Sequence, residues 1–254
     1  MLRMLSFLVA TAIALYLFLC AFLWASQTQM IFLPQGTRVR PQATNFELLS
    51  DGLRLRGWCV NPGQSRALSY FGGNAEASNH QRERFARWFP QHTVFLLAYR
   101  GYGASEGSPS EAGLKQDALT LYDHIAGDHT RIDVIGRSVG SGVALHLAAR
   151  RAVGRLALIT PYDSLVAVAA RHYPWFPVRW LLHQRFEASA DAAQVQVPTL
   201  LLIARQDEII PPAHAEALAQ AFRPSPEIQW LDTDHNTVEM DARFALALQR
   251  FFRE

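Results

Sequence analysis

The 254-residue chain has little cysteine, almost no lysine and little net charge. Of its two cysteines, only Cys59 lies outside the apolar N-terminal stretch, so the body of the protein has no pair for a disulfide. Lys115 is the only lysine, and the formal net charge of +2 is too small to indicate nucleic acid binding. These scarcities exclude a disulfide-stapled scaffold and a strongly basic nucleic-acid interface.

Patterns for metals and nucleotides are also missing from the sequence. We find no metal-ligand spacing, internal repeat or low-complexity tract. The glycine-rich segment Gly72–Glu76 lacks the further glycines, or the Gly-Lys-Ser/Thr ending, of nucleotide-binding loops. We therefore expect no cofactor, no metal and no nucleic acid partner.

The first residues form a long apolar run. Met4–Trp24 carries no charge and is long enough to cross a bilayer as a helix. A cleaved signal sequence needs small residues near its cleavage site, whereas Leu23 and Trp24 are large, which favours an uncleaved signal anchor. We expect an anchor over residues 1–26, with Cys20 facing lipid, and a connector over residues 27–43.

The flanking charges predict the orientation of this anchor. Arg3 and the amino terminus lie on one side, and Arg38 and Arg40 are the nearest positive charges on the other. The positive-inside rule then favours a cytoplasmic amino terminus with the folded body outside. The arginine and alanine bias is typical of a GC-rich bacterial genome, so we expect a single-pass inner-membrane protein with a periplasmic body.

Residues 44–254 are expected to form one α/β domain. Half of the chain is apolar, enough for one large core, and β-branched runs alternate with helical stretches. Alternating segments at Asn45–Ser50 and Leu53–Val60 flank Asp51-Gly52 and predict an antiparallel hairpin.

A candidate nucleophile lies between a strand and a helix. Gly136-Arg137-Ser138-Val139-Gly140 follows the β-branched run Ile132–Ile135 and precedes an apolar helical stretch over Val143–Ala149. A nucleophile elbow needs glycines on both sides of its serine, because strand and helix crowd there. Ser138 is therefore the candidate nucleophile, although the motif alone also fits an ordinary glycine-rich turn.

A serine nucleophile needs a base and an acid, which in this order follow it along the chain. Asp207 lies just beyond the buried strand Val197–Ala204 and is the leading acid, with Glu208 and Asp163 as alternatives. His235 follows the strand Ile228–Leu231 and is the leading base. The other histidines weighed as bases are expected to be solvated or packing residues; they are His172, His183 and His214.

Acyl transfer also needs backbone N–H groups aimed at the developing oxyanion. One should be the N–H of Val139, directly after the candidate nucleophile. The other should come from the turn after the third strand, where Asn74 is the candidate donor and Gly73 the alternative.

Taken together, these motifs resemble those of the membrane-anchored α/β-hydrolase-domain (abhydrolase) serine hydrolases, related to serine aminopeptidases and esterases. The matching segments are Phe71–Ala75, Tyr99–Gly107, Gly136–Gly140, Pro161–Ser164, Asp207–Pro212 and His235-Asn236. The resemblance implies an α/β-hydrolase fold with a mostly parallel eight-stranded sheet, helices on both faces and a short helical cap after strand 6. It also implies Ser138, Asp207 and His235 as catalytic residues, with Asn74 and Val139 in the oxyanion hole. Gly72 departs from the family pattern, which usually has histidine there, and this predicts a less supported oxyanion turn.

The expected cap covers about residues 164–190 and is rich in aromatic side chains. Beside a membrane anchor, this composition favours an acyl or lipid-like substrate, although the aromatics also fit packing on the core or at the membrane interface. The predicted function is a serine hydrolase that cleaves a carboxylic ester or thioester. A peptidase or amidase, or a catalytically silent binding protein of the same fold, remains an alternative.

Overall fold

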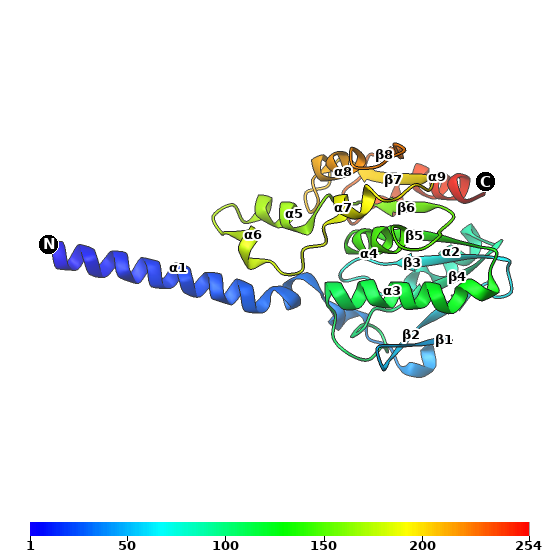
Figure 1. Cartoon of the computed structure of the whole chain (residues 1–254), viewed down its shortest axis with the longest axis horizontal. Coiled ribbons are helices and arrows are strands. Elements are labelled where there is room, and N and C mark those ends of the chain that lie inside the picture. Colours follow the sequence, from blue (N-terminus) through cyan, green and yellow to red (C-terminus); the bar gives the residue numbers. More distant parts are fainter. Residues whose placement is uncertain (254) are drawn as a thin grey trace.

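A computed structural model describes residues 1–253 and contains one eight-stranded sheet (Figure 1). The strand order is β1-β2-β4-β3-β5-β6-β7-β8, and only the pairings of β1 with β2 and of β2 with β4 are antiparallel. The strands are β1 (Phe46–Ser50), β2 (Leu53–Val60), β3 (Arg66–Phe71), β4 (His92–Leu97), β5 (Arg131–Arg137), β6 (Leu156–Ile159), β7 (Thr199–Ala204) and β8 (Glu227–Leu231). The mostly parallel eight-stranded sheet is as predicted.

The hairpin of β1 and β2 also matches its prediction. Asp51 and Gly52 connect the strands with φ of 51° and 76°, the left-handed region that a tight two-residue hairpin loop requires. The central strands β4, β6 and β7 are buried along their whole length, because helices cover both faces of the parallel part of the sheet.

Helices cover both faces in two groups. On one face, α2 (Arg82–Trp88) packs against α9 (Ala242–Arg253) through Trp88 with Phe244 and Phe89 with Phe252. On the other face, neighbouring helices contact one another in series. These are α3 (Glu111–Ile125), α4 (Val139–Ala148), α7 (Ala188–Ala192) and α8 (Pro212–Ala219).

The N-terminal helix α1 (Leu2–Ile31) projects away from this body (Figure 1). Among the described residues it is the one helix long and apolar enough to cross a membrane. The helix continues five residues beyond residue 26, where the sequence places the end of the anchor. Cys20 was expected to face lipid, but that prediction is wrong: its exposed fraction is 8%, and it lies on the helix face turned toward the cap.

The cap follows β6, as predicted, and lies between α1 and the sheet (Figure 1). It contains α5 (Leu165–His172) and α6 (Val178–Leu181), and an extended segment leads on to α7. Ser164 caps α5 by accepting a hydrogen bond from the N–H of Ala167 at 3.0 Å, which explains why the helix begins directly after it. Helix α6 contacts α1, so the cap packs on the N-terminal helix.

Glycine is required where α4 leaves β5. Helix α4 begins at Val139, four residues earlier than the apolar pattern predicts, because Ser138 serves as its N-cap residue. A Cβ atom on Gly140 would overlap the carbonyl oxygen of Phe71 in β3. The helix therefore sits against the strand as closely as a glycine permits.

We expect Gly140→Ala to lower the free energy of unfolding by about 3 kcal/mol or more, because strand β3 has to move to relieve the overlap. Gly127→Ala is the matched control: a Cβ atom there meets nothing within 4 Å, so a change within about 0.5 kcal/mol is expected. Denaturant unfolding of both variants in detergent measures the difference. Equal unfolding midpoints would contradict the close packing described here.

Candidate active site

Ser138 occupies the sharp turn between β5 and α4. Its backbone has φ of 52° and ψ of −121°, a conformation that costs a non-glycine residue free energy and is held only by its surroundings. The N–H of Ser138 donates to the carbonyl oxygen of Ile159 in β6 at 2.9 Å. The strained turn places the hydroxyl at the carboxyl edge of the sheet, as a nucleophile elbow does.

His235 and Asp207 reach this hydroxyl from the loops after β8 and β7. Nε2 of His235 lies 3.1 Å from Oγ of Ser138, and Nδ1 lies 2.7 Å from Oδ2 of Asp207. The other carboxylate oxygen of Asp207 accepts hydrogen bonds from the N–H groups of Ile209 at 3.0 Å and Ile210 at 2.7 Å. All three predicted residues are buried, and they form one continuous hydrogen-bonded chain.

The alternative acids and bases are engaged elsewhere. Asp163 pairs with His214, with Oδ1 2.8 Å from Nδ1. His172 contacts the carbonyl oxygen of Ile209 at 2.9 Å and is exposed, and the ring of His183 packs edge-on against Trp24. Glu208 lines the cavity above Ser138, but the structure brings its neighbour Asp207 to the histidine.

Two backbone N–H groups near Ser138 are free to donate to an oxyanion. Within residues 1–253, neither the N–H of Val139 nor that of Asn74 donates a hydrogen bond to another group of the chain. The N–H of Gly73, the alternative donor, is already used: it donates to Oε2 of Glu76 at 2.9 Å. Asn74 and Val139 therefore stay the candidate donors.

Glu76 supports the turn that carries Asn74. A Cβ atom on Gly72 would lie 3.2 Å from Oε2 of Glu76, so this carboxylate fills the space beside the glycine that departs from the family pattern. Its Oε1 accepts hydrogen bonds from the hydroxyl of Tyr70 at 2.6 Å and from Nε2 of Gln81 at 2.9 Å. Burial, and after it the Glu76 charge, raises the pKa of Tyr70 well above its usual value, so the hydroxyl remains a donor. Sequence reasoning missed Glu76.

Arg137 connects this turn to the loop of His235. Its Nη1 lies 3.5 Å from Oε2 of Glu76 and 3.3 Å from Oε1 of Glu239, and its Nη2 donates to the carbonyl oxygen of His235 at 3.5 Å. Gln81 also bridges the two carboxylates, donating to Glu239 at 3.0 Å. Arg137, the residue between the glycine and the serine of the elbow motif, thus connects the turn of Asn74 to the loop of His235.

The carbonyl groups of the turn are fixed by buried tyrosines and by the chain after α1. The carbonyl oxygen of Asn74 accepts from the Tyr102 hydroxyl at 2.6 Å and from the N–H of Leu33 at 3.0 Å. That of Gly72 accepts from the Tyr99 hydroxyl at 2.9 Å. Burial raises the pKa of Tyr99 well above its usual value. These contacts give the segment Tyr99–Gly107 a structural role in support of the turn.

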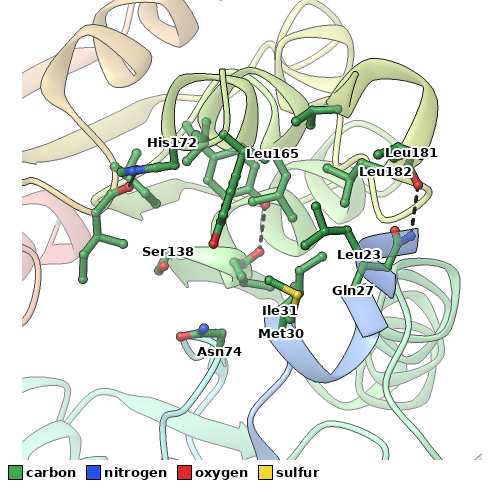
Figure 2. A pocket seen from close by; sticks show the side chains of 18 of the residues that line it. Leu23, Gln27, Met30, Ile31, Asn74, Ser138, Leu165, His172, Leu181 and Leu182 are labelled. Carbon is green, nitrogen blue, oxygen red and sulfur yellow. Dashed lines mark hydrogen bonds between the residues drawn. The ribbon is translucent and has the colours of Figure 1, made fainter. Parts of the chain in front are cut away.

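A cavity of about 690 Å³ lies above Ser138, within the about 300–1,000 Å³ usual for small-molecule sites (Figure 2). Its lining is mainly apolar, and α1, the cap and the loop after β7 all contribute to it. Asn74 and Ser138 lie together on one side, and Leu23, Gln27, Met30 and Ile31 line another. Within residues 1–253, no group of three or more histidine, cysteine, aspartate or glutamate side chains is placed to hold a metal.

Comparison with known proteins gives a consistent result for sequence and fold. The family model described as Serine hydrolase (FSH1) matches residues 62–238. The Mycobacterium tuberculosis protein Rv2307c is 34% identical over an alignment that covers 92% of this chain and 89% of that protein. The alpha/beta hydrolase domain-containing protein WAV2 of Arabidopsis thaliana is 31% identical, covering 72% of this chain and 68% of the relative.

The crystal structure of an alpha-beta hydrolase from Vibrio vulnificus has a TM-score of 0.73. The match covers 89% of this chain and 92% of that one, at 19% sequence identity. At that identity the likeness shows the fold alone, and the predicted α/β-hydrolase fold is confirmed.

We expect Glu76→Gln to lower kcat for ester hydrolysis about tenfold with little change in KM. The amide retains the shape but removes the charge opposite Arg137 and one acceptor, so the turn of Asn74 shifts. The Glu76 carboxylate does not line the cavity, so its loss should change kcat through the position of the oxyanion donor and leave substrate binding unaffected. Removal of an oxyanion donor itself costs about a hundredfold or more.

Steady-state kinetics on a short-chain ester measures this effect. Glu83→Gln is the control, because Glu83 is exposed on the neighbouring helix α2. A wild-type kcat for Glu76→Gln would contradict the supporting role.

Proposed function

Because this chain belongs to the Serine hydrolase (FSH1) family, we propose that it cleaves carboxylic esters or thioesters through an acyl-enzyme formed on Ser138. The observation that carries the proposal is the pair of contacts of His235, 3.1 Å to Oγ of Ser138 and 2.7 Å to Oδ2 of Asp207. A serine next to a base that is itself oriented by a carboxylate is the arrangement that activates a hydroxyl at neutral pH.

In the first step, Oγ of Ser138 attacks the carbonyl carbon and Nε2 of His235 takes the hydroxyl proton. Asp207 accepts the Nδ1–H hydrogen bond, which selects the tautomer and stabilises the imidazolium. The N–H groups of Val139 and Asn74 stabilise the oxyanion, and the alcohol or thiol leaves with the proton from His235. Water, deprotonated by His235, then attacks the acyl-enzyme; the bond from carbonyl carbon to Oγ breaks and Ser138 recovers its proton.

The cavity supports an acyl or lipid-like substrate. Its lining is apolar except for a few groups, of which Ser138 and Asn74 lie beside the reacting position. Such a surface binds an unbranched acyl group by burial of apolar area, and among the residues that line it Glu208 alone carries a carboxylate that could pair with the amino terminus of a peptide. This favours ester or thioester hydrolysis over peptide hydrolysis.

We also propose that residues 1–26 anchor the protein in a membrane, with a connector over residues 27–43 and the hydrolase domain over residues 44–254. The apolar helix α1 supports this, since its 30 residues are about 45 Å long and exceed the about 30 Å hydrocarbon core of a bilayer. Arg3 on the amino-terminal side supports a cytoplasmic amino terminus and a periplasmic hydrolase domain.

We expect Ser138→Ala and His235→Ala to abolish labelling by a fluorophosphonate probe, and each to lower ester turnover by at least about a thousandfold. Asp207→Asn should lower turnover by a similar factor, because the amide favours the wrong tautomer of His235. The measurements use the full-length protein in detergent, with labelling and turnover of a short-chain ester recorded on the same samples.

Two matched variants are the controls for these losses. His214→Ala and Glu216→Gln change residues of α8 that do not line the cavity, and both should retain labelling within about twofold. Full turnover by Ser138→Ala contradicts the mechanism. A folded wild-type protein that neither labels nor turns over esters would instead be a silent binding protein of the hydrolase fold.

A further inference from the structure

The end of α1 forms part of the cavity wall. Leu23, Met30 and Ile31 line the cavity from α1, and Ser138 and Asn74 lie across it (Figure 2). From Leu23 to Ile31 the helix rises about 12 Å, so it borders the cavity over about two turns. The proposed membrane anchor and the proposed active site therefore share one surface.

One face of α1 is fitted to the cap. Tyr16, Cys20, Leu23 and Gln27 are spaced four, three and four residues apart, which places them on one side of a helix. The Tyr16 hydroxyl donates to the carbonyl oxygen of Trp175 at 3.0 Å, and its ring stacks on Phe176 with centroids 5.8 Å apart. The cap thus contacts α1 within the apolar stretch Met4–Trp24.

Gln27 fixes this contact. Its Nε2 donates to the carbonyl oxygens of Trp24 at 2.8 Å and Leu181 at 3.0 Å. Its Oε1 accepts from the N–H groups of His183 at 2.7 Å and Gln184 at 3.4 Å. A buried amide with four partners holds a defined position, because leaving any of its groups unpaired in an apolar region is unfavourable. Helix α1 is therefore part of the folded domain at this point.

The mouth of the cavity is apolar and lies beside the helix. Met30, Tyr173 and Ile209 line the cavity and remain exposed. Nearby on the cap, Trp175 and Trp180 have exposed fractions of 84% and 88%. Exposed tryptophans next to a membrane-spanning helix are typical of the membrane–water interface, where their rings are most stable. This places the mouth at the lipid surface.

We propose that the substrate is a long-chain acyl ester or thioester resident in the bilayer, and that its chain reaches Ser138 along the cavity face of α1. This rests on the proposed function and adds the source and the class of the acyl group. Extraction of a long chain through water costs free energy in proportion to its methylene groups, whereas passage from lipid into an adjoining apolar cavity does not. Leu23, Met30 and Ile31 of α1 are then specificity-determining residues.

The polar groups of the lining agree with this class of substrate. Ser138 and Asn74 mark the place of the carbonyl group, and the side chain of Gln27 is fully engaged with the backbone. His172 and Glu208 are exposed polar residues of the lining, where the polar part of a lipid lies. The remaining lining residues present apolar or aromatic surface to the chain.

The test compares bulky substitutions on two sides of α1 in the full-length protein, reconstituted in vesicles of phosphatidylethanolamine and phosphatidylglycerol. Leu23→Trp fills the cavity, and Ala25→Trp adds the same bulk on the exposed, opposite side of the helix. Turnover of umbelliferyl palmitate and umbelliferyl butyrate is measured for each. We expect Leu23→Trp to lower the palmitate-to-butyrate ratio about tenfold and Ala25→Trp to leave the ratio unchanged.

A second pair removes the ambiguity of a folding defect. Met30→Trp lies at the exposed mouth, where bulk does not disturb the core, and Gln29→Trp is its exposed neighbour. If Leu23→Trp loses labelling by a fluorophosphonate, Met30→Trp and Gln29→Trp replace the first pair in the test. We then expect Met30→Trp to lower the palmitate-to-butyrate ratio about tenfold and Gln29→Trp to leave it unchanged.

An unchanged palmitate-to-butyrate ratio in the cavity-facing variants overturns the inference, as does an equal fall in the matched controls. So does a wild-type protein that cleaves butyrate but not palmitate in vesicles; in that case the proposed hydrolase function survives. Loss of both butyrate turnover and probe labelling in the wild-type protein is the different result that defeats the proposed function itself.

Discussion

The strained backbone of Ser138 is the constraint on which the geometry of the site depends. A φ of 52° is unfavourable for serine and persists because strand β5, helix α4 and the neighbouring strands leave no other path for the chain. Gly140 sits against the carbonyl group of Phe71, and the N–H of Ser138 is held by Ile159. The same turn leaves the N–H of the next residue, Val139, without an acceptor within residues 1–253. Packing of the sheet thus positions both the candidate nucleophile and one candidate oxyanion donor.

The second candidate donor, the N–H of Asn74, lies on a turn that is fixed by charged side chains and buried tyrosine hydroxyl groups. Glu76 accepts a hydrogen bond from the N–H of Gly73. Arg137 contacts both this carboxylate and the carbonyl oxygen of His235, so it connects the two loops. The carbonyl oxygen of Asn74 is held by Tyr102 and by Leu33, which is the second residue after α1. The chain just after α1 is therefore hydrogen-bonded directly to the turn that carries Asn74.

The order of Ser138, Asp207 and His235 was predictable from the sequence because each follows a strand, and parallel strands bring their carboxyl ends to one edge. The eight-stranded, mostly parallel sheet and the cap after its sixth strand were predicted instead from the resemblance of the motifs to the α/β-hydrolase family. Glu76 was not, because the departure at Gly72 suggested lost support, and only the folded turn shows a carboxylate filling that space. Cys20 was misjudged because hydropathy treats all sides of an apolar helix alike.

The partners of the N-terminal helix α1 lie too far along the chain for any local pattern to indicate them. Gln27 and Leu181 are 154 residues apart, yet their hydrogen bond sets the angle between α1 and the cap. A buried amide in an apolar helix is unfavourable unless its groups are hydrogen-bonded. Gln27 therefore favours the arrangement of α1 and the cap in which backbone groups of the cap pair with its amide. That arrangement also places Leu23 and Ile31 in the cavity wall. One polar residue therefore connects three features that hydropathy treats as separate: the orientation of α1, the position of the cap and the lining of the cavity above Ser138.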